Sequence, residues 1–130
     1  QIYVVSQACP LFVPLAEEGW VSGSVPTAIA TTYLEPIKRS NVDTLILGCT
    51  HYPLLKLILK QVLGSDVSLV DSGEATAATV NSVLNKNNIV SNENRGEIHC
   101  YVTDSRDSFE ALAGRFVHSN ISEITHVDIS

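Results

Sequence analysis

Short apolar runs alternate with longer amphipathic segments along this 130-residue chain. Five runs are rich in β-branched or aromatic residues and short enough for strands, which predicts strands over Ile2 to Val5, Val42 to Leu47, Val67 to Val70, Ile98 to Val102 and Ile124 to Ile129. Between them, apolar residues recur at helical spacing, which predicts helices from Ser24 to about Arg39, Leu54 to Gly64, Glu74 to Leu84 and Ser105 to Phe116. The segment through Cys9, Pro10 and Pro14 is predicted to be a loop.

This order of elements predicts an α/β fold. Strict alternation with short connections favours a parallel sheet with helices on both faces, because parallel neighbours need a crossover helix. The length suits one compact unit, and 45% hydrophobic with 17% charged residues is typical of a globular protein. In such folds, ligands bind beyond the carboxyl ends of the strands.

Charge and cysteine content exclude several classes of function. Eight Lys plus Arg against fourteen Asp plus Glu give a net charge of −6, and no basic cluster indicates a nucleic-acid partner. The apolar runs are too short for a membrane span, so we expect a cytoplasmic protein. Cys9, Cys49 and Cys100 are widely spaced, which argues against a disulfide framework or a metal site. Cys9 and Cys100 are expected to be packing residues.

The candidate site is the segment Gly48-Cys49-Thr50-His51, where a predicted strand ends and a helix is about to begin. Gly48 lets the backbone turn without a Cβ clash, and Pro53 suits the first helical turn. The pKa of a thiol near a helix N-terminus and an imidazole can be lowered, so Cys49 could act as a base. Alternatively, Cys49 packs inertly and His51 caps a backbone carbonyl. Spacing alone does not decide between these interpretations.

Longer strings carry a family resemblance. Leu45-Ile46-Leu47-Gly48-Cys49-Thr50-His51-Tyr52-Pro53-Leu54-Leu55 resembles the second catalytic-cysteine motif of bacterial glutamate racemases almost residue for residue. Ala8-Cys9-Pro10-Leu11-Phe12-Val13-Pro14-Leu15-Ala16-Glu17 looks like that family's acid-bearing loop, and Val70-Asp71-Ser72-Gly73 looks like its following strand end. The resemblance implies the aspartate/glutamate racemase fold. It also implies that the chain is the C-terminal half, because the family's first catalytic Cys and Asp-Ser loop have no equivalent here.

The resemblance further implies a mechanism without pyridoxal phosphate, metal or other cofactor. In the family, two cysteines face opposite sides of the substrate's α-carbon, and one removes a proton as thiolate while the other returns one. Cys49 would be the thiol that acts on the L-enantiomer, and His51 its acid/base assistant and part of the binding surface. Thr50 would contact the substrate's α-amino or carboxylate end, and Glu17 would orient or tune His51. Asp71 and Ser72 are expected to be structural.

The same resemblance sets the expected function and partners. It implies an isomerase that converts L-glutamate to D-glutamate for peptidoglycan synthesis, hence for cell wall biogenesis and cell shape, but that is inactive without the N-terminal half. Residues 1–72 would belong to the domain that bears Cys49, and residues 73–130 would return to the first domain. Without the N-terminal half, the strand edges of residues 73–130 would be unpaired, which favours homo-oligomers. The alternatives are an aspartate or other amino-acid racemase, or a non-catalytic module that binds a small acid or a protein. The corresponding motif of aspartate racemases resembles Gly-Cys-Thr-Glu. His51 stands at the position of that Glu, which favours glutamate as the substrate.

Overall fold

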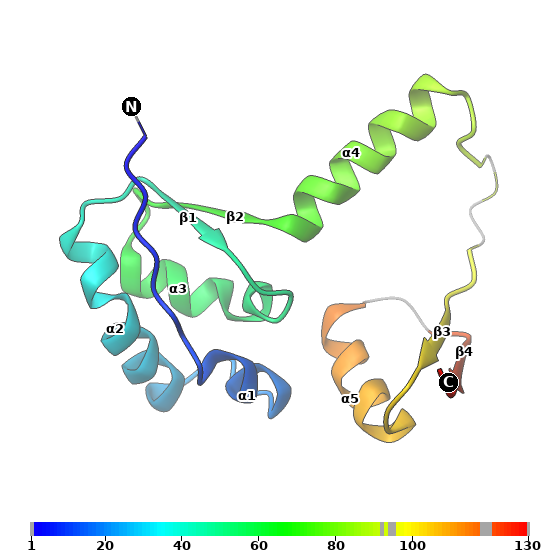
Figure 1. The fold of residues 1–130 in the computed structure, drawn as a ribbon, viewed down its shortest axis with the longest axis horizontal. Coiled ribbons are helices and arrows are strands. Elements are labelled where there is room, and N and C mark those ends of the chain that lie inside the picture. Colours follow the sequence, from blue (N-terminus) through cyan, green and yellow to red (C-terminus); the bar gives the residue numbers. More distant parts are fainter. Residues whose placement is uncertain (1, 92, 94–95, 118–120, 130) are drawn as a thin grey trace. The chain divides into compact units, whose positions relative to one another are not determined.

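The computed structural model describes residues 2–91, 93, 96–117 and 121–129, in two compact units, Gln1–Lys86 and Asn87–Ser130. Each unit holds two parallel strands joined by a crossover helix (Figure 1). In chain order the elements are α1 (Phe12–Glu17), α2 (Ser24–Arg39), β1 (Thr44–Leu47), η1 (Tyr52–Leu55), α3 (Lys56–Leu63), β2 (Ser68–Asp71), α4 (Ser72–Lys86), β3 (His99–Val102), α5 (Arg106–Phe116) and β4 (Glu123–His126). In this described part, no helix is long and apolar enough to cross a membrane.

The sheet of the first unit consists of β1 and β2. They pair in parallel, with Leu47 opposite Asp71 at their carboxyl ends. The crossover passes through α3, which packs beside α2. Leu45 and Leu47 belong to the core side of β1, whereas Ile46 points to the other face and is 74% exposed. The sheet therefore has one core face and one face that is exposed in the described part of the chain.

An apolar cluster beneath this sheet forms the core of the first unit. The Phe12 ring from α1 meets Tyr33 and Tyr52 edge to face, with ring centroids 5.4 Å apart in both pairs. On α3, apolar residues at helical spacing place Leu59 in the centre of the cluster, where it is 1% exposed. The other buried members are Cys9, Leu15, Ala30, Leu34, Ile37, Leu47, Leu55 and Ile58.

The second unit is smaller and follows the predicted pattern. β3 and β4 pair in parallel, with His99 opposite Glu123. The helix predicted to begin at Ser105 is confirmed, because the Ser105 hydroxyl caps α5 by accepting a hydrogen bond from the Ser108 amide at 3.4 Å. Ala113 on α5 is buried. The sequence thus correctly predicted both strands and the helix between them.

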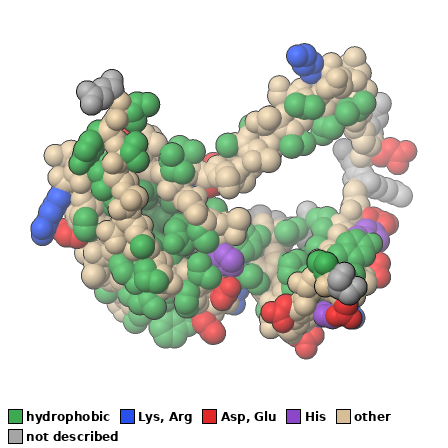
Figure 2. Space-filling view, viewed as in Figure 1, with side chains coloured by type: hydrophobic (Ala, Val, Ile, Leu, Met, Phe, Trp, Pro, Cys, Tyr) green, Lys and Arg blue, Asp and Glu red, His purple; other side chains and the backbone are tan. Residues whose placement is uncertain are grey.

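The first unit ends with the long helix α4. None of its described residues is buried, and Val80 and Val83 are half-exposed apolar side chains on it. Figure 2 shows such apolar side chains along this helix. The first compact unit extends to Lys86. The predicted division of the chain between two racemase domains after Ser72 stays a prediction. Two further expectations stay predictions. Residues 73–130 are expected to pack against the N-terminal half of a racemase, and to self-associate without it.

Two predictions near the N-terminus are wrong. Residues 2–5 are extended but form no strand, because β1 pairs with β2 alone among the described strands and leaves its other edge open. Both residues 2–5 and β1 line a cavity of about 810 Å³. The element order consequently begins with two helices, and two separate two-stranded sheets replace the single sheet expected from alternation.

The second error is the loop predicted through Pro10 and Pro14. Phe12–Glu17 is instead the short helix α1, whose Phe12, Leu15 and Ala16 are buried. Pro14 is tolerated because it lies in the first turn, where backbone N–H groups have no partner within the helix. Burial of one apolar face therefore outweighs the two prolines.

We expect Leu59→Ala to destabilise the first unit by about 2–5 kcal/mol, because it leaves a cavity in the centre of the core. Leu57→Ala is the matched control, since Leu57 lies on the same helix but is 84% exposed, and it should change stability by about 0.5 kcal/mol or less. Urea unfolding followed by the fluorescence of Trp20, the single tryptophan, measures both changes. Equal effects of the two substitutions would contradict this description of the core.

The second unit should lose stability as the pH rises. His99 lies 3.2 Å from carboxylate oxygens of both Glu97 and Glu123, and their hydrogen bonds raise its pKa above the ordinary value of 6.5. A raised folded-state pKa stabilises the fold fully below pH 6.5, and this contribution is lost as the pH rises through the folded-state value.

Amide hydrogen-exchange protection in β3, corrected for the intrinsic exchange rate, should therefore fall as the pH rises above 6.5. His99→Gln should abolish that dependence, whereas His126→Gln in the neighbouring strand should keep it. The same pH dependence in wild type and His99→Gln would show that the His99 contacts do not hold the sheet.

Candidate active site

The candidate site lies in the loop between β1 and α3, beyond the carboxyl end of β1. The Tyr52 amide donates to the Cys49 carbonyl at 3.2 Å, and the Leu54 amide donates to the His51 carbonyl at 3.2 Å. These bonds wind the loop into the 3-10 helix η1 before α3 begins at Lys56. Cys49 is therefore followed by a 3-10 turn, and the α-helix predicted from Leu54 begins two residues later, at Lys56.

The predicted role of Gly48 in this turn is wrong. A Cβ atom at Gly48 would meet nothing within 4 Å, and the residue does not adopt the left-handed conformation that favours glycine. The loop conformation thus depends on the hydrogen bonds of η1 and on the packing of its side chains. Pro53 does lie in the first turn of η1, as expected from its missing N–H.

His51 lies between a thiol and a carboxylate. Its Nδ1 atom is 3.9 Å from Cys49 Sγ and 3.4 Å from the Thr50 hydroxyl oxygen. Its Nε2 atom is 3.4 Å from Glu17 Oε1, at the end of α1. The imidazole is mostly covered, with 22% of its side chain exposed, whereas Glu17 is 52% exposed. The structure therefore brings together all four residues that the sequence singled out, and their catalytic roles stay a prediction.

Such an arrangement can move a proton. A thiol and a carboxylate on opposite nitrogens of one imidazole allow the ring to accept a proton at one nitrogen while the other nitrogen stays bonded. The Glu17 contact also fixes the orientation of the ring, as the third member of an acid/base arrangement commonly does. The site is thus suited to proton abstraction by Cys49 with help from His51.

Tyr52 is a member of this site that the sequence analysis did not assign. Its hydroxyl donates to the Cys9 carbonyl at 3.3 Å, and its ring packs against Phe12. Burial raises the pKa of Tyr52, and negative charge on Cys9 or Cys49 raises it further. Tyr52 thereby ties the loop to the segment that precedes α1. Its place in the motif was visible in the sequence, but the partner backbone carbonyl was not.

The other two cysteines are placed differently. Cys9 is buried in the core, as expected of a packing residue, and burial raises the pKa of its thiol. Its Sγ atom lies 3.7 Å from the Gln7 carbonyl oxygen. Cys100 is half-buried in β3 of the second unit. Within the described residues, no group of three or more His, Cys, Asp or Glu side chains could hold a metal ion.

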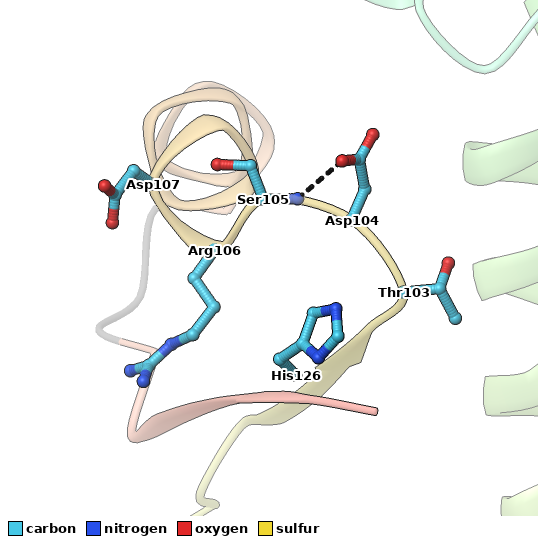
Figure 3. Close-up of a pocket in the computed structure, with 6 residues that line it drawn as sticks. All are labelled: Thr103, Asp104, Ser105, Arg106, Asp107 and His126. Atoms are coloured by element: carbon cyan, nitrogen blue, oxygen red, sulfur yellow. Dashed lines mark hydrogen bonds between the residues drawn. The ribbon is translucent and has the colours of Figure 1, made fainter. Parts of the chain in front are cut away.

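The second unit has a polar hollow of its own at the carboxyl ends of β3 and β4. Figure 3 shows its lining residues, which are Thr103, Asp104, Ser105, Arg106, Asp107 and His126. Asp104 accepts a hydrogen bond from the Ser105 amide at 2.7 Å, beside the start of α5. The side chains are of mixed charge, and none of them was assigned a catalytic or binding role from the sequence.

We expect Cys49 to be the first of the three thiols to react with an alkylating agent. It is less buried than Cys9 and lies beside an imidazole, whereas burial raises the pKa of Cys9. Substoichiometric iodoacetamide at neutral pH followed by peptide mapping measures the order. His51→Asn should slow Cys49 and leave Cys100 unchanged. Faster labelling of Cys9 or Cys100 would contradict the assignment.

Comparisons with known proteins show what the chain is similar to. No protein-family model matches the chain. The glutamate racemase of Geobacter metallireducens is 41% identical over 99% of the chain and 48% of its own length. The crystal structure of Francisella tularensis glutamate racemase with D-glutamate matches 98% of the chain and 48% of its own, at 34% identity and a TM-score of 0.85.

The Thermus thermophilus glutamate racemase, solved with β-chloro-D-alanine, matches 95% of the chain and 47% of its own, at 40% identity and a TM-score of 0.82. These structures confirm the predicted α/β fold of the racemase type. The chain spans about half the length of the curated relatives that it matches, which fits the C-terminal half expected from the order of the motifs. In sequence and in fold, the chain is similar to glutamate racemases over nearly all of its own length.

Proposed function

We propose that this chain supplies one side of the active site of a cofactor-independent glutamate racemase. The observation that carries the proposal is the line of contacts from Cys49 Sγ through the His51 imidazole to Glu17 Oε1, at 3.9 Å and 3.4 Å. Its place beyond the carboxyl end of β1 is where α/β folds bind ligands. The whole protein would act in the cytoplasm and make D-glutamate for peptidoglycan.

In the proposed reaction, the Cys49 thiolate removes the α-proton of L-glutamate. The carbanion then takes a proton on its opposite face from a second thiol, which becomes the thiolate, so that one proton enters and one leaves. His51 carries the proton to and from Cys49 Sγ, and Glu17 holds the ring in place through Nε2. Because Cys9 is buried in the core, we assign the second thiol to a part of the protein outside this chain.

Thr50 is proposed to bind the substrate. Its side chain is exposed, and its hydroxyl lies 3.4 Å from His51 Nδ1, on the same side of the ring as Cys49 Sγ. A hydroxyl there can donate a hydrogen bond to a substrate carboxylate or accept one from its α-ammonium group. The relatives solved with D-glutamate and with β-chloro-D-alanine bind amino acids, which supports a ligand of this class.

The test needs the chain joined to the half that its relatives carry beyond it. In that protein, Cys49→Ser should abolish racemisation of glutamate. His51→Asn should slow proton abstraction from L-glutamate by about a hundredfold to ten-thousandfold, the usual contribution of a positioned acid/base group, and should affect D-glutamate less. Washout of an α-deuterium label from each enantiomer separates the two directions. Cys100→Ser serves as the matched control and should keep full activity.

Several outcomes would overturn the proposal. Unchanged racemisation in Cys49→Ser would remove the residue from the mechanism, and equal slowing of both enantiomers by His51→Asn would refute the assignment of one face. Racemisation of aspartate in preference to glutamate would identify another racemase. Binding of a small acid with no label exchange would identify a non-catalytic module. The 130-residue chain alone should not racemise glutamate, because a single thiol cannot serve both faces.

A further inference from the structure

Asp71 is the one buried charged residue in the described part of the chain, with 4% of its surface exposed. It ends β2 and directly precedes α4. Its Oδ1 atom accepts a hydrogen bond from the Glu74 amide at 2.8 Å, which makes it the cap of that helix. Its Oδ2 atom is paired with the ammonium group of Lys56, the first residue of α3.

Both ends of the candidate site loop are held at Asp71, one by its backbone and one by its side chain. The loop consists of residues 48–55 and carries Cys49, Thr50 and His51. At its start, Leu47 is held opposite Asp71 in the parallel ladder. At its end, Lys56 is held by the ion pair with the Asp71 side chain. One buried residue therefore closes the loop, and the number of conformations open to the loop is reduced accordingly.

We propose that Lys56 and Asp71 are positioning residues, which hold His51 beside Cys49 by closing the loop that carries both. This inference rests on the proposed function for its consequence in catalysis. In this proposal, neither Lys56 nor Asp71 contacts the substrate. The two act through the backbone of η1, because His51 directly precedes η1 and Lys56 directly follows it.

The ion pair between Lys56 and Asp71 is suited to holding the loop closed. A buried carboxylate without a partner is costly, so the Asp71 carboxylate favours conformations in which Lys56 reaches it. Hydrogen bonds from Lys56 and from the Glu74 amide lower the pKa of Asp71, and bonds to Asp71 and Glu74 raise the pKa of Lys56. Both groups thus stay charged at neutral pH, and the pair stays closed.

The experiment measures alkylation of each of the three thiols in the 130-residue chain. Lys56→Met should lower the rate at Cys49 by about threefold or more, because the imidazole is no longer held beside the thiol, whereas Lys56→Arg should restore it. Buried Cys9 reports any opening of the first unit, and Cys100 in the second unit gives the baseline. Lys60→Met is the matched control, since Lys60 lies one turn later on α3 and donates to the Val67 carbonyl, away from the loop.

A double-mutant cycle separates positioning from mere stability. If Lys56 acts through His51, then Lys56→Met should change the Cys49 rate little in a His51→Asn background. Additive effects would overturn the inference, and so would an unchanged Cys49 rate in Lys56→Met with Cys9 still protected.

If Lys56→Met opens the unit and exposes Cys9, the decisive variant is Lys56→Met with Asp71→Asn. It leaves no buried charge unpaired while keeping a capping oxygen. A wild-type Cys49 rate in that folded variant would also refute the inference.

These readouts do not depend on racemisation. The proposed function could fail, with Cys49→Ser fully active, while the coupling of Lys56 to Cys49 is still observed. In a racemase that carries both thiols, Lys56→Met should lower kcat with little change in KM, because Lys56 does not contact the substrate. The opposite split, with KM raised and kcat kept, would place Lys56 in substrate binding and contradict a positioning role.

Discussion

A charged carboxylate at the buried end of a strand must be paired, and much of the first unit is arranged around that requirement. Asp71 accepts the amide of Glu74 and the ammonium of Lys56, so a single side chain joins the end of β2, the start of α3 and the start of α4. Gly73 is part of the same arrangement, because a Cβ atom there would lie 3.1 Å from Asp71 Oδ1. The segment Asp71-Ser72-Gly73 thus has a structural role, as expected for Asp71 and Ser72.

The candidate site depends on a second anchor, at the other side of the loop. Packing of Phe12 against Tyr52 places α1 beside η1, and the Tyr52 hydroxyl reaches the Cys9 carbonyl. That packing is what brings Glu17 to the far nitrogen of His51, although the two are distant in sequence. The acid/base arrangement is therefore held by core contacts on one side and by an ion pair on the other.

The sequence predicted best where local rules decide the structure. Apolar periodicity located the helix over Ser24–Arg39 and the strands β1 to β4, and Ser105 marked the start of α5. It failed at α1, because two prolines signal a loop and only the burial of Phe12 and Leu15 reveals a helix. It also failed at residues 2–5, since a strand needs a paired neighbour that no local pattern reports.

For the site, the motif identified Cys49, Thr50, His51 and Glu17, and the structure places them together. The supporting contacts could not be predicted, because Lys56 with Asp71 and Tyr52 with Cys9 are pairs that fold together from separate elements. Such contacts depend on the register of β1 against β2 and on the packing of α1. The pattern of residues along the chain reports neither the register of the strands nor the packing of α1.

The proposed racemisation needs an acid or base on each face of the α-carbon, and the described part of the first unit offers one such thiol, that of Cys49. Cys49 lies at the open end of β1 with its imidazole, whereas the Cys9 side chain is buried in the core with a raised pKa. The sheet is similarly one-sided, with Ile46 exposed on its uncovered face and the outer edge of β1 unpaired among the described strands. The relatives carry about as much chain again as this sequence matches. Under the proposed function, packing against such a segment covers the apolar face and supplies the opposing thiol, so the fold is assembled and the active site completed in one process.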